Sequence, residues 1–580
     1  MTRRTRLLFH AVLLFGVCAS HASMAAAASP SPRPPAMGRI ASRHMIVAAE
    51  PDAAEAGLAM LRQGGSAIDA AIAAEMVLTL EEPQSSGLGG GAYMIVADGA
   101  ALSAYDGREV APASASPTMF LDGQGKPRSH ADAIPGGLSV GVPGIIRMFA
   151  LAHAKHGRLP WAKLFEPAIR LAENGFTVPA RLARELAEGG PKLAAMPGIA
   201  ELFFTRDGRP LREGEKWRNP RLAQTFRLIA EKGPDAFYNG PIAGHIARAV
   251  TGAPRNPVRM TEGDIAGYAA KIREPICGAY RGYRLCSVPP STSGGTTVLQ
   301  ILGMLERFPP AQFRAGTLSS VHLVSEAERL AYADRDRWLG DPDFVSVPLS
   351  GLLDRAYLQG RARLIDPMRA MMTASAGTPP VKQGALLDYT PQSPQIEHGT
   401  THLSVVDERG EAVSLTASIE AAFGAHIAAA GFLLNNELTD FSFVPVENGL
   451  PVANAPAPGK RPLSSQAPFI VFGPDGKFFA AVGSPGGRRI VSYVAQALVN
   501  LIDSNLSMPE VAAAPRHMNL NSPTFIERGT PLESLSPRLT AMGHEVRIAG
   551  FDSGINGIKR VANGYEGGAD PRREGVALGD

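Results

Sequence analysis

The chain has 580 residues, of which 45% are hydrophobic and 19% are charged. This composition predicts a folded globular protein and argues against disorder, and the length allows several domains or one large, elaborated domain. The formal net charge is +3, and three arginines in the first six residues account for all of it. The rest is close to neutral, which argues against a nucleic-acid or membrane-surface partner.

Residues 1–28 have the pattern of an export signal. Three arginines precede the apolar run 7–18, and the small-residue stretch 25–28 follows. The apolar run is shorter than the about 20 residues that a bilayer span needs. We expect a signal peptide over 1–28 and a periplasmic or secreted mature protein without a membrane span.

The first half of the chain predicts alternating helices and short strands. Residues 52–63 and 66–80 form two Ala-rich helical patterns, with Ser66 placed as an N-cap. Residues 92–97 predict a buried strand. Helical periodicity recurs over 143–175, 220–232, 241–251, 297–306 and 316–338.

Two cysteines remain after the predicted signal, Cys277 and Cys286. A hairpin turning at Arg281-Gly282 would place them opposite each other, at a spacing that suits a disulfide. An exported protein meets oxidising conditions. We therefore expect a disulfide, with two buried free thiols as the alternative.

The second half changes character after 370–399, a stretch rich in Ser, Thr, Gly, Pro and Gln that indicates a linker. Strand hairpins follow over 400–407 with 411–419 and over 467–473 with 478–482. A helix is predicted over 488–502. Clustered strands with flanking helices predict stacked sheets covered by helices, an α+β fold.

Three motifs suggest chemistry that their context does not support. Residues 87–92 match a dinucleotide-binding glycine pattern, but a helix precedes them and a strand follows, the reverse of the required order. Residues 137–141 match a nucleophile elbow, but no buried strand leads into them. His153 and His156 lack a third ligand. We expect no cofactor and no metal.

Four polar clusters in the second half carry the chemistry of an amide-cleaving acyl transfer. Thr400 opens the first strand and offers a hydroxyl nucleophile. Residues 435–440 supply an acidic pair, residues 462–465 a hydroxyl pair, and residues 483–487 a glycine-rich turn before a helix, where backbone amides favour anions.

Together with motifs of the first half, these clusters resemble the gamma-glutamyltransferase family of N-terminal nucleophile hydrolases over roughly residues 38–580. The first-half motifs are Glu82-Pro83-Gln84, Gly89-Gly90-Gly91, Arg108-Glu109-Val110-Ala111-Pro112, Pro143-Gly144 and the segments 289–295, 331–335 and 340–344. The resemblance implies a four-layer αββα sandwich. It also implies a zymogen that cuts itself between Gly399 and Thr400 into a large subunit, 29–399, and a small catalytic subunit, 400–580, which stay together as a heterodimer.

The resemblance also implies the roles of the site residues. The freed α-amine of Thr400, with a pKa near 7.7–8.0, would serve as base for its own hydroxyl, so His402 is expected to be structural. Ser418 stands where the family usually has Thr, and Glu420 where many members have Asn. The expected catalytic residues are Thr400, Ser418 and the oxyanion-hole glycines Gly486 and Gly487; those expected to bind substrate are Arg108, Ser464 and Ser465 for a carboxylate and Glu420, Glu437 and Asp440 for an ammonium group.

We therefore expect a self-processing gamma-glutamyltransferase/glutathione hydrolase, acting on glutathione and other γ-glutamyl compounds with water, amino acids or peptides as acceptors. Residues 441–459, which match the family's lid loop, are short and lack Tyr, so we expect an open acceptor side. The alternative within the family is a glutaryl/cephalosporin acylase. An inactive binding protein on the same scaffold is the alternative from another class.

Overall fold

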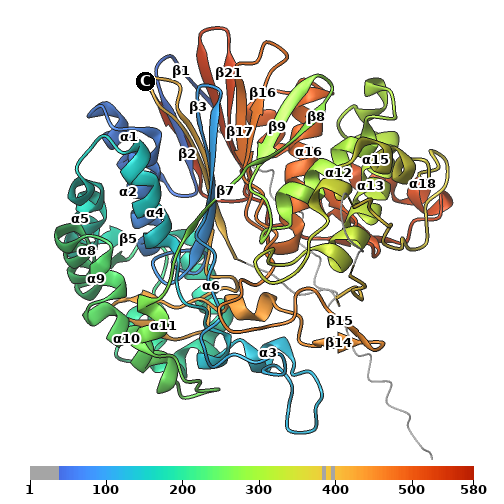
Figure 1. Ribbon diagram of the computed structural model, residues 1–580. Coiled ribbons are helices and arrows are strands. Elements are labelled where there is room, and N and C mark those ends of the chain that lie inside the picture. Colours follow the sequence, from blue (N-terminus) through green and yellow to red (C-terminus); the bar gives the residue numbers. More distant parts are fainter. Residues whose placement is uncertain (1–37, 382–386, 393–398) are drawn as a thin grey trace, which may run out of the picture. The chain divides into compact units, whose positions relative to one another are not determined.

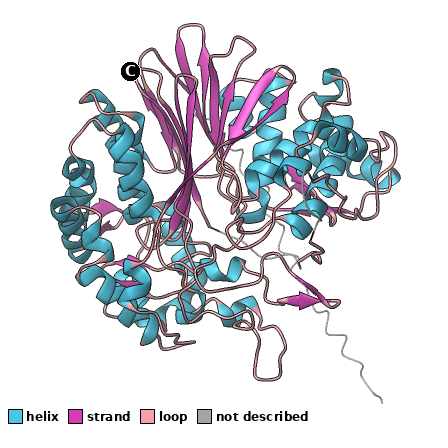
Figure 2. Ribbon diagram, in the orientation of Figure 1, coloured by secondary structure: helices cyan, strands magenta, loops and turns pink. Residues whose placement is uncertain are grey.

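Two seven-stranded antiparallel sheets lie face to face in the middle of the fold (Figure 1, Figure 2). The computed structural model describes residues 38–381, 387–392 and 399–580, so the predicted signal peptide lies outside it. In spatial order, the first sheet contains β1 (Gly38–Ala41), β22 (Gly564–Ala569), β21 (Asn556–Val561), β17 (Phe478–Gly483), β16 (Phe469–Phe472), β9 (Tyr283–Ser287) and β8 (Ile276–Tyr280). The second contains β23 (Val576–Gly579), β2 (Met45–Ala48), β10 (Thr401–Val406), β11 (Ala412–Ser418), β3 (Gly91–Asp98), β4 (Ala101–Asp106) and β7 (Lys271–Arg273).

The alternation of side chains along each strand separates three hydrophobic layers. In β3, Met94 and Val96 join the helix-facing core, whereas Tyr93 and Ile95 join the cluster between the sheets. In the same way, the side chains of β16 alternate between the inter-sheet cluster and a second helix-facing core. Successive strand side chains point to opposite faces, so both sheets are buried on both sides.

Helices cover the two outer faces (Figure 1). The second sheet is covered by helices that include α1 (Pro51–Arg62), α2 (Ala67–Glu81), α4 (Ile145–His156), α5 (Glu166–Asn174), α8 (Pro220–Lys232) and α10 (Pro241–Thr251). The first sheet is covered by helices that include α12 (Gly294–Leu305), α13 (Leu318–Trp338), α15 (Arg355–Ala362) and α16 (Ile490–Ile502). The predicted four-layer αββα sandwich is confirmed.

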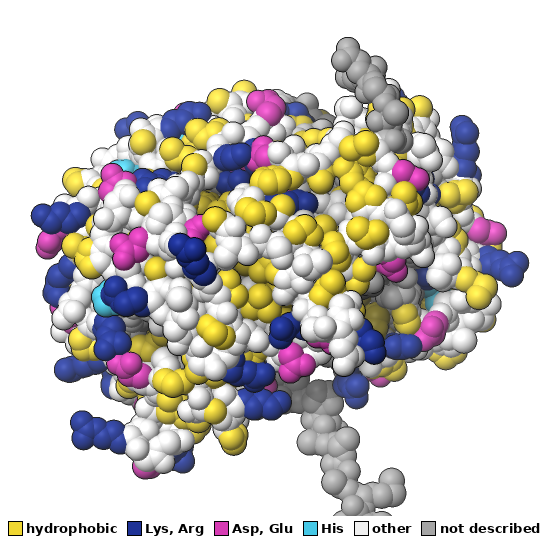
Figure 3. Space-filling model, turned by 60° about the horizontal axis from the view of Figure 1, so that its bottom comes forward, with side chains coloured by type: hydrophobic (Ala, Val, Ile, Leu, Met, Phe, Trp, Pro, Cys, Tyr) yellow, Lys and Arg dark blue, Asp and Glu magenta, His cyan; other side chains and the backbone are white. Residues whose placement is uncertain are grey.

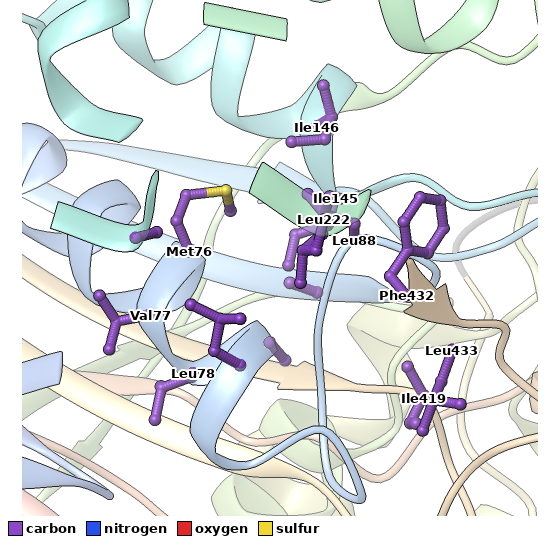
Figure 4. Close-up of a cluster of buried hydrophobic side chains, with 14 of the residues drawn as sticks. Met76, Val77, Leu78, Leu88, Ile145, Ile146, Leu222, Ile419, Phe432 and Leu433 are labelled. Atoms are coloured by element: carbon purple, nitrogen blue, oxygen red, sulfur yellow. The ribbon is translucent and has the colours of Figure 1, made fainter. Parts of the chain in front are cut away.

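Helix α2 is the clearest case of a sequence pattern realised in the structure. The Ser66 side chain accepts the Asp69 N–H and the Asp69 side chain accepts the Ser66 N–H, which closes a capping box. Every residue of the helix is buried. Figure 4 shows Met76, Val77 and Leu78 of α2 within the cluster that includes Ile145 and Phe432. A helix with apolar residues on every side belongs inside a large core, although α2 also buries Asp69, Glu75 and Glu81.

Smaller elements connect and extend these layers. The remaining helices are α3 (His130–Ala133), α6 (Ala180–Ala194), α7 (Pro197–Phe203), α9 (Asp235–Tyr238), α11 (Glu262–Ala266), α14 (Leu349–Leu352), α17 (Met508–Ala513) and α18 (Ser536–Ala541). The small sheets pair β5 (Phe176–Thr177) with β6 (Lys216–Trp217), β12 (Ala428–Ala429) with β13 (Phe432–Leu433), β14 (Val446–Glu447) with β15 (Leu450–Pro451), and β18 (His517–Met518) with β19 (Thr524–Glu527) and β20 (Val546–Ala549).

The hairpin β8–β9 turns at Arg281 and Gly282 and places Cys277 directly opposite Cys286. A disulfide joins them, with an S–S distance of 2.05 Å and a Cα–Cα distance of 4.1 Å. The sulfur atoms tie a hairpin at the edge of the first sheet, where β8 has a neighbour on one side only.

The surface carries mixed charges. On the face shown in Figure 3, Lys and Arg side chains are interspersed with acidic and apolar ones and form no continuous strip. Over the described ranges, no helix is long and apolar enough to cross a membrane.

The segment predicted as a linker is docked where the structure describes it. Tyr389 is buried, the Thr390 N–H donates to the Pro451 carbonyl, and the Gln392 N–H donates to the Asp336 carbonyl. Residues 387–392 are therefore held against the body by their backbone, in contrast to the linker expected from composition.

Candidate active site

Thr400 lies immediately before β10, a central strand of the second sheet. Three contacts fix it: its N–H donates to the Ser85 carbonyl at 3.3 Å, its carbonyl accepts from the Arg573 guanidinium at 3.1 Å, and its Oγ1 lies 3.1 Å from Ser418 Oγ. The residue is 3% exposed. Both backbone polar groups of Thr400 are thus anchored, and only the hydroxyl faces the site.

The backbone on either side of the Gly399–Thr400 bond is held in the left-handed region. Thr400 has a φ of 80° and Gly399 a φ of 86°. A β-branched residue at positive φ is a genuine outlier, and such strain costs on the order of 1–3 kcal/mol. A Cβ on Gly399 would lie 2.0 Å from the Glu420 carbonyl oxygen. Only glycine fits before the nucleophile.

Ser418 is the hydrogen-bonding partner of the Thr400 hydroxyl. It ends β11, whose Ala417 pairs with Thr401 of β10, so sheet register brings the two hydroxyls together. Ser418 Oγ also accepts the Glu420 N–H at 2.8 Å. The Glu420 N–H occupies one lone pair of Ser418 Oγ. Ser418 can therefore donate its hydroxyl proton to Thr400 Oγ1, or accept the Thr400 hydroxyl proton on its second lone pair.

Arg108 follows β4 and is surrounded by carboxylates. Its two terminal nitrogens contact Glu437 and Asp440, its Nε donates to the Pro462 carbonyl at 3.2 Å, and Glu109 lies 3.8 Å away. The side chain is 1% exposed. The residues expected to bind a substrate carboxylate and those expected to bind an ammonium group therefore pair with one another here.

Burial raises the pKa of all three acids around Arg108. Desolvation raises the pKa of Glu437 and of Glu109 to about 8 and that of Asp440 to about 7, opposed by the positive charge of Arg108. Three carboxylates sharing one guanidinium cannot all be ionised at low cost. The cluster therefore holds protons near neutral pH that a bound cation would displace.

The remaining predicted residues surround the same pocket. It is lined by Arg108, Thr400, Ser418, Glu420, Glu437, Asp440, Ser464, Ser465, Gln466, Gly487 and Ile490. Glu420 is contacted by the Asn436 amide, and Ser465 Oγ accepts from the Arg335 guanidinium at 2.8 Å. All the predicted catalytic and substrate-binding residues except Gly486 line this pocket, and no residue of 441–459 does.

Gly486 and Gly487 lead into a helical segment at the pocket wall. A single 3₁₀ turn over Gly487–Arg489 precedes α16, so the regular helix begins two residues later than predicted. Gly486 has a φ of 129°, and a Cβ there would lie 2.7 Å from the Tyr493 ring. N–H groups at a helix start lack intrahelical partners and point outward, which suits an oxyanion.

A network behind Thr400 was missed by the sequence reasoning. Arg573 contacts both the Thr400 carbonyl and Glu82, and Arg181 contacts Glu82 and Ser85 Oγ. Glu82 stands in a motif that carried the family resemblance. Arg573 lies at the far end of the chain, and nothing in its local sequence indicates contact with residue 400.

The motifs set aside by the sequence reasoning are structural. A Cβ on Gly90 would lie 2.0 Å from the Ser418 carbonyl oxygen, so the glycine run lets this loop approach the end of β11. His402 is buried between Thr416 and Ser404, and desolvation lowers its pKa to about 3. His153 and His156 contact the Leu159 carbonyl and Glu411 respectively.

Comparison with known proteins agrees with this geometry. The sequence model of the family described as Gamma-glutamyltranspeptidase matches residues 53–580. The chain belongs to the gamma-glutamyltranspeptidase family. It is 38% identical over 585 residues to a glutathione hydrolase proenzyme of Escherichia coli strain K12, covering 97% of this chain and 96% of that protein.

Relatives with a different name are also similar. An acylase ACY 1 proenzyme of Pseudomonas sp. strain SE83 is 36% identical over 542 residues, covering 91% of this chain and 92% of the relative. The crystal structure of a cephalosporin acylase from Bacillus halodurans superposes with a TM-score of 0.83 at 28% identity, covering 96% of this chain and 98% of the other. The family thus includes proteins named as glutathione hydrolases and proteins named as acylases. The residues of the pocket have to distinguish between these two activities.

Gly399→Ala tests the constraint at the proposed cleavage bond. The added methyl collides with the Glu420 carbonyl at a positive φ, so we expect the fraction of chain cut at this bond to fall at least about tenfold. The matched control is Gly410→Ala, which has a φ of 82° but whose Cβ would meet nothing closer than 3.9 Å. Denaturing gels over time give the readout. Equal cutting of the two variants would contradict this account.

Proposed function

We propose that this protein is a self-processing gamma-glutamyltransferase and glutathione hydrolase. The supporting observation is that Thr400 Oγ1 and the Arg108–Glu437–Asp440 cluster line one pocket. That arrangement supports the proposal, because a hydroxyl nucleophile would then lie within reach of a substrate whose α-carboxylate and α-ammonium are held by opposite charges. A γ-glutamyl group carries both charges at one end and its amide at the other.

Maturation begins with attack by Thr400 Oγ1 on the carbonyl carbon of Gly399. The tetrahedral intermediate collapses by breaking the Gly399–Thr400 C–N bond, which leaves an ester on Oγ1 and a free α-amine on Thr400. Water then hydrolyses the ester, giving a large subunit that ends at Gly399 and a small subunit, 400–580. Strain at Thr400, a β-branched residue at positive φ, favours this step because cleavage releases it.

In the mature enzyme the Thr400 α-amine takes the proton from Oγ1 as that oxygen attacks the γ-carbonyl of the donor. Gly486 and Gly487 amides stabilise the oxyanion, a contribution for which removal of one donor typically costs ~10²–10³ in rate. The amine leaves with a proton, and the γ-glutamyl ester on Thr400 passes to water or to an acceptor amine.

Substrate binding exchanges the partners of Arg108. The donor carboxylate takes the guanidinium, with hydroxyl support from Ser464 and Ser465, and the donor ammonium takes the carboxylates of Glu437, Asp440 and Glu420. Each charge keeps a partner through this exchange, which is required in a buried site. Residues 441–459 do not line the pocket, so acceptors approach from an open side.

A glutaryl/cephalosporin acylase is the second candidate, favoured by the named relatives. A glutaryl group brings a carboxylate without an ammonium, so it would take Arg108 from Glu437 and Asp440 without giving these acids a cation in return. The acid cluster therefore favours a γ-glutamyl donor.

We also propose that the protein acts outside the cytoplasm, in the periplasm or the medium, after removal of residues 1–28. The disulfide between Cys277 and Cys286 supports this, because such bonds persist in oxidising compartments.

Thr400→Ala should leave one uncut chain without activity, because it removes the attacking oxygen of both reactions. The matched control is Thr401→Ala, which deletes the neighbouring buried hydroxyl, an oxygen that has no hydrogen-bond partner among the residues the structure describes. That control should be cut and active. Gels and γ-glutamyl-p-nitroanilide hydrolysis give the readout, and a cut, active Thr400→Ala protein would refute the assignment.

The acid cluster predicts how donor binding depends on pH. The raised pKa values of Glu437 and Asp440 mean that both lose protons between about pH 6.5 and 8.5, and only the ionised forms pair with an ammonium. The KM for γ-glutamyl-p-nitroanilide should therefore fall at least about fivefold from pH 6 to pH 8.5.

A glutaryl-p-nitroanilide comparison separates the two candidates. Without an ammonium group it should bind less well as these acids ionise, so its KM should rise over the same pH range. A preferred glutaryl substrate, or parallel pH profiles for the two compounds, would favour the acylase instead.

A further inference from the structure

A cavity of about 640 Å³ lies between α12, α15 and the β8–β9 hairpin, the elements grouped at the right of Figure 1. None of its lining residues lines the Thr400 pocket. Its volume falls within the roughly 300–1,000 Å³ typical of small-molecule sites. The proposed enzymatic mechanism uses no part of it.

Each wall of this cavity is one face of an element. On α15, the lining residues recur at helical spacing, and the pattern continues to the first residue after the helix. On α12 they also recur at helical spacing, and the pattern continues to the second residue after the helix. They are Arg355, Leu358, Gln359, Ala362 and Arg363 on the first, and Leu299, Gly303, Glu306 and Arg307 on the second. The hairpin contributes Cys277, Gly278, Ala279 and Gly282.

Two glycines keep the apolar floor open. A Cβ on Gly303 would lie 2.6 Å from Leu358 Cδ1, and a Cβ on Gly278 would lie 2.9 Å from Leu299 Cδ2. Side chains at these positions would fill the space between the helices and the hairpin. The floor is thus formed by leucines and alanine around a gap that glycine maintains.

The rim carries positive charge that the protein leaves uncompensated. Over the described part of the chain, the guanidinium groups of Arg355 and Arg363 have no hydrogen-bond or ion-pair partner. Arg307 donates to the Ala362 carbonyl at 2.8 Å, which leaves its charge unpaired. The one acid of the lining, Glu306, contacts Arg281, which is not part of the lining.

Helix stability does not explain the first of these arginines. Arg355 is the first residue of α15, where the helix dipole disfavours a cation. Arginine is the side chain best suited to hold a carboxylate, since its planar fork matches the two oxygens. Arg307 and Arg363 lie at one end of the apolar floor, because Arg307 donates to the carbonyl of Ala362, the residue before Arg363. This arrangement is complementary to a molecule with one anionic end and one apolar end.

We propose that this cavity binds a small anionic amphiphile, a carboxylate with a medium-length acyl chain. The carboxylate lies between Arg307 and Arg363 at the C-terminal end of α15, and the chain lies on Leu299, Leu358 and Ala362, toward Arg355 at the other end of the helix. This site is separate from the Thr400 pocket and does not depend on the function proposed for it.

Isothermal titration of the processed protein with decanoate, below its micelle concentration, tests this site. We expect one decanoate per heterodimer, and affinity at least about tenfold lower for R355E/R363E, because the charge at the rim is reversed. The matched control R206E/R409E reverses two exposed arginines elsewhere on the surface, whose side chains have no partner within residues 38–381, 387–392 and 399–580. It should bind as the unmodified protein does.

One further variant and one further ligand make the test of this site decisive. Ala279→Trp fills the cavity from an exposed strand position and should abolish binding even if the charge variant proves unstable. Decyltrimethylammonium, with a cationic head, should bind at least about tenfold more weakly than decanoate. Circular dichroism and γ-glutamyl-p-nitroanilide hydrolysis should be unchanged in all variants.

Three results would overturn the proposal. They are absence of decanoate binding to the unmodified protein, equal binding of the cationic amphiphile, and binding that survives both R355E/R363E and Ala279→Trp. Sedimentation gives a further test. If the surface around this cavity instead joins two copies of this chain, the unmodified protein will be a dimer that does not bind decanoate. In that case R355E/R363E will dissociate the dimer.

Discussion

The backbone constraint at Gly399 and Thr400 is the feature on which the rest of the site depends. Both residues are held at positive φ, and the Thr400 N–H and carbonyl are fixed by Ser85 and Arg573. The sandwich supplies this constraint, because Thr400 enters a central strand whose register with β11 sets the position of Ser418. The proposed nucleophile is thus positioned by sheet pairing, next to a rigid element.

A second constraint is electrostatic. One buried arginine is shared by Glu109, Glu437 and Asp440, so the empty pocket is neutralised by protons and internal ion pairs. A substrate head group with both charges can replace these pairs one for one. Buried charges left without partners are costly, so we expect this cluster to select for a zwitterionic donor on physical grounds, before any contact to the rest of the substrate is considered.

Much of the fold and most of the pocket could be predicted from the sequence, for identifiable reasons. The strand that follows Thr400, the capping box at Ser66 and the glycine turn at Gly486 are local patterns, and family motifs assign roles to Arg108 and Asp440. Arg573 and Arg181 could not be found this way, because their contacts with Thr400, Ser85 and Glu82 join segments far apart in sequence. Composition also suggested a linker at 387–392, where backbone hydrogen bonds dock the chain.

The central claim is that Thr400 becomes chemically competent by becoming the first residue of a new chain. N-terminal sequencing of the chains in purified active protein, combined with a glutathione hydrolysis assay on the same sample, tests it most directly. We predict two chains in equal amounts, one of which begins at Thr400. Material that is continuous across residues 399 and 400 and still hydrolyses glutathione would contradict it.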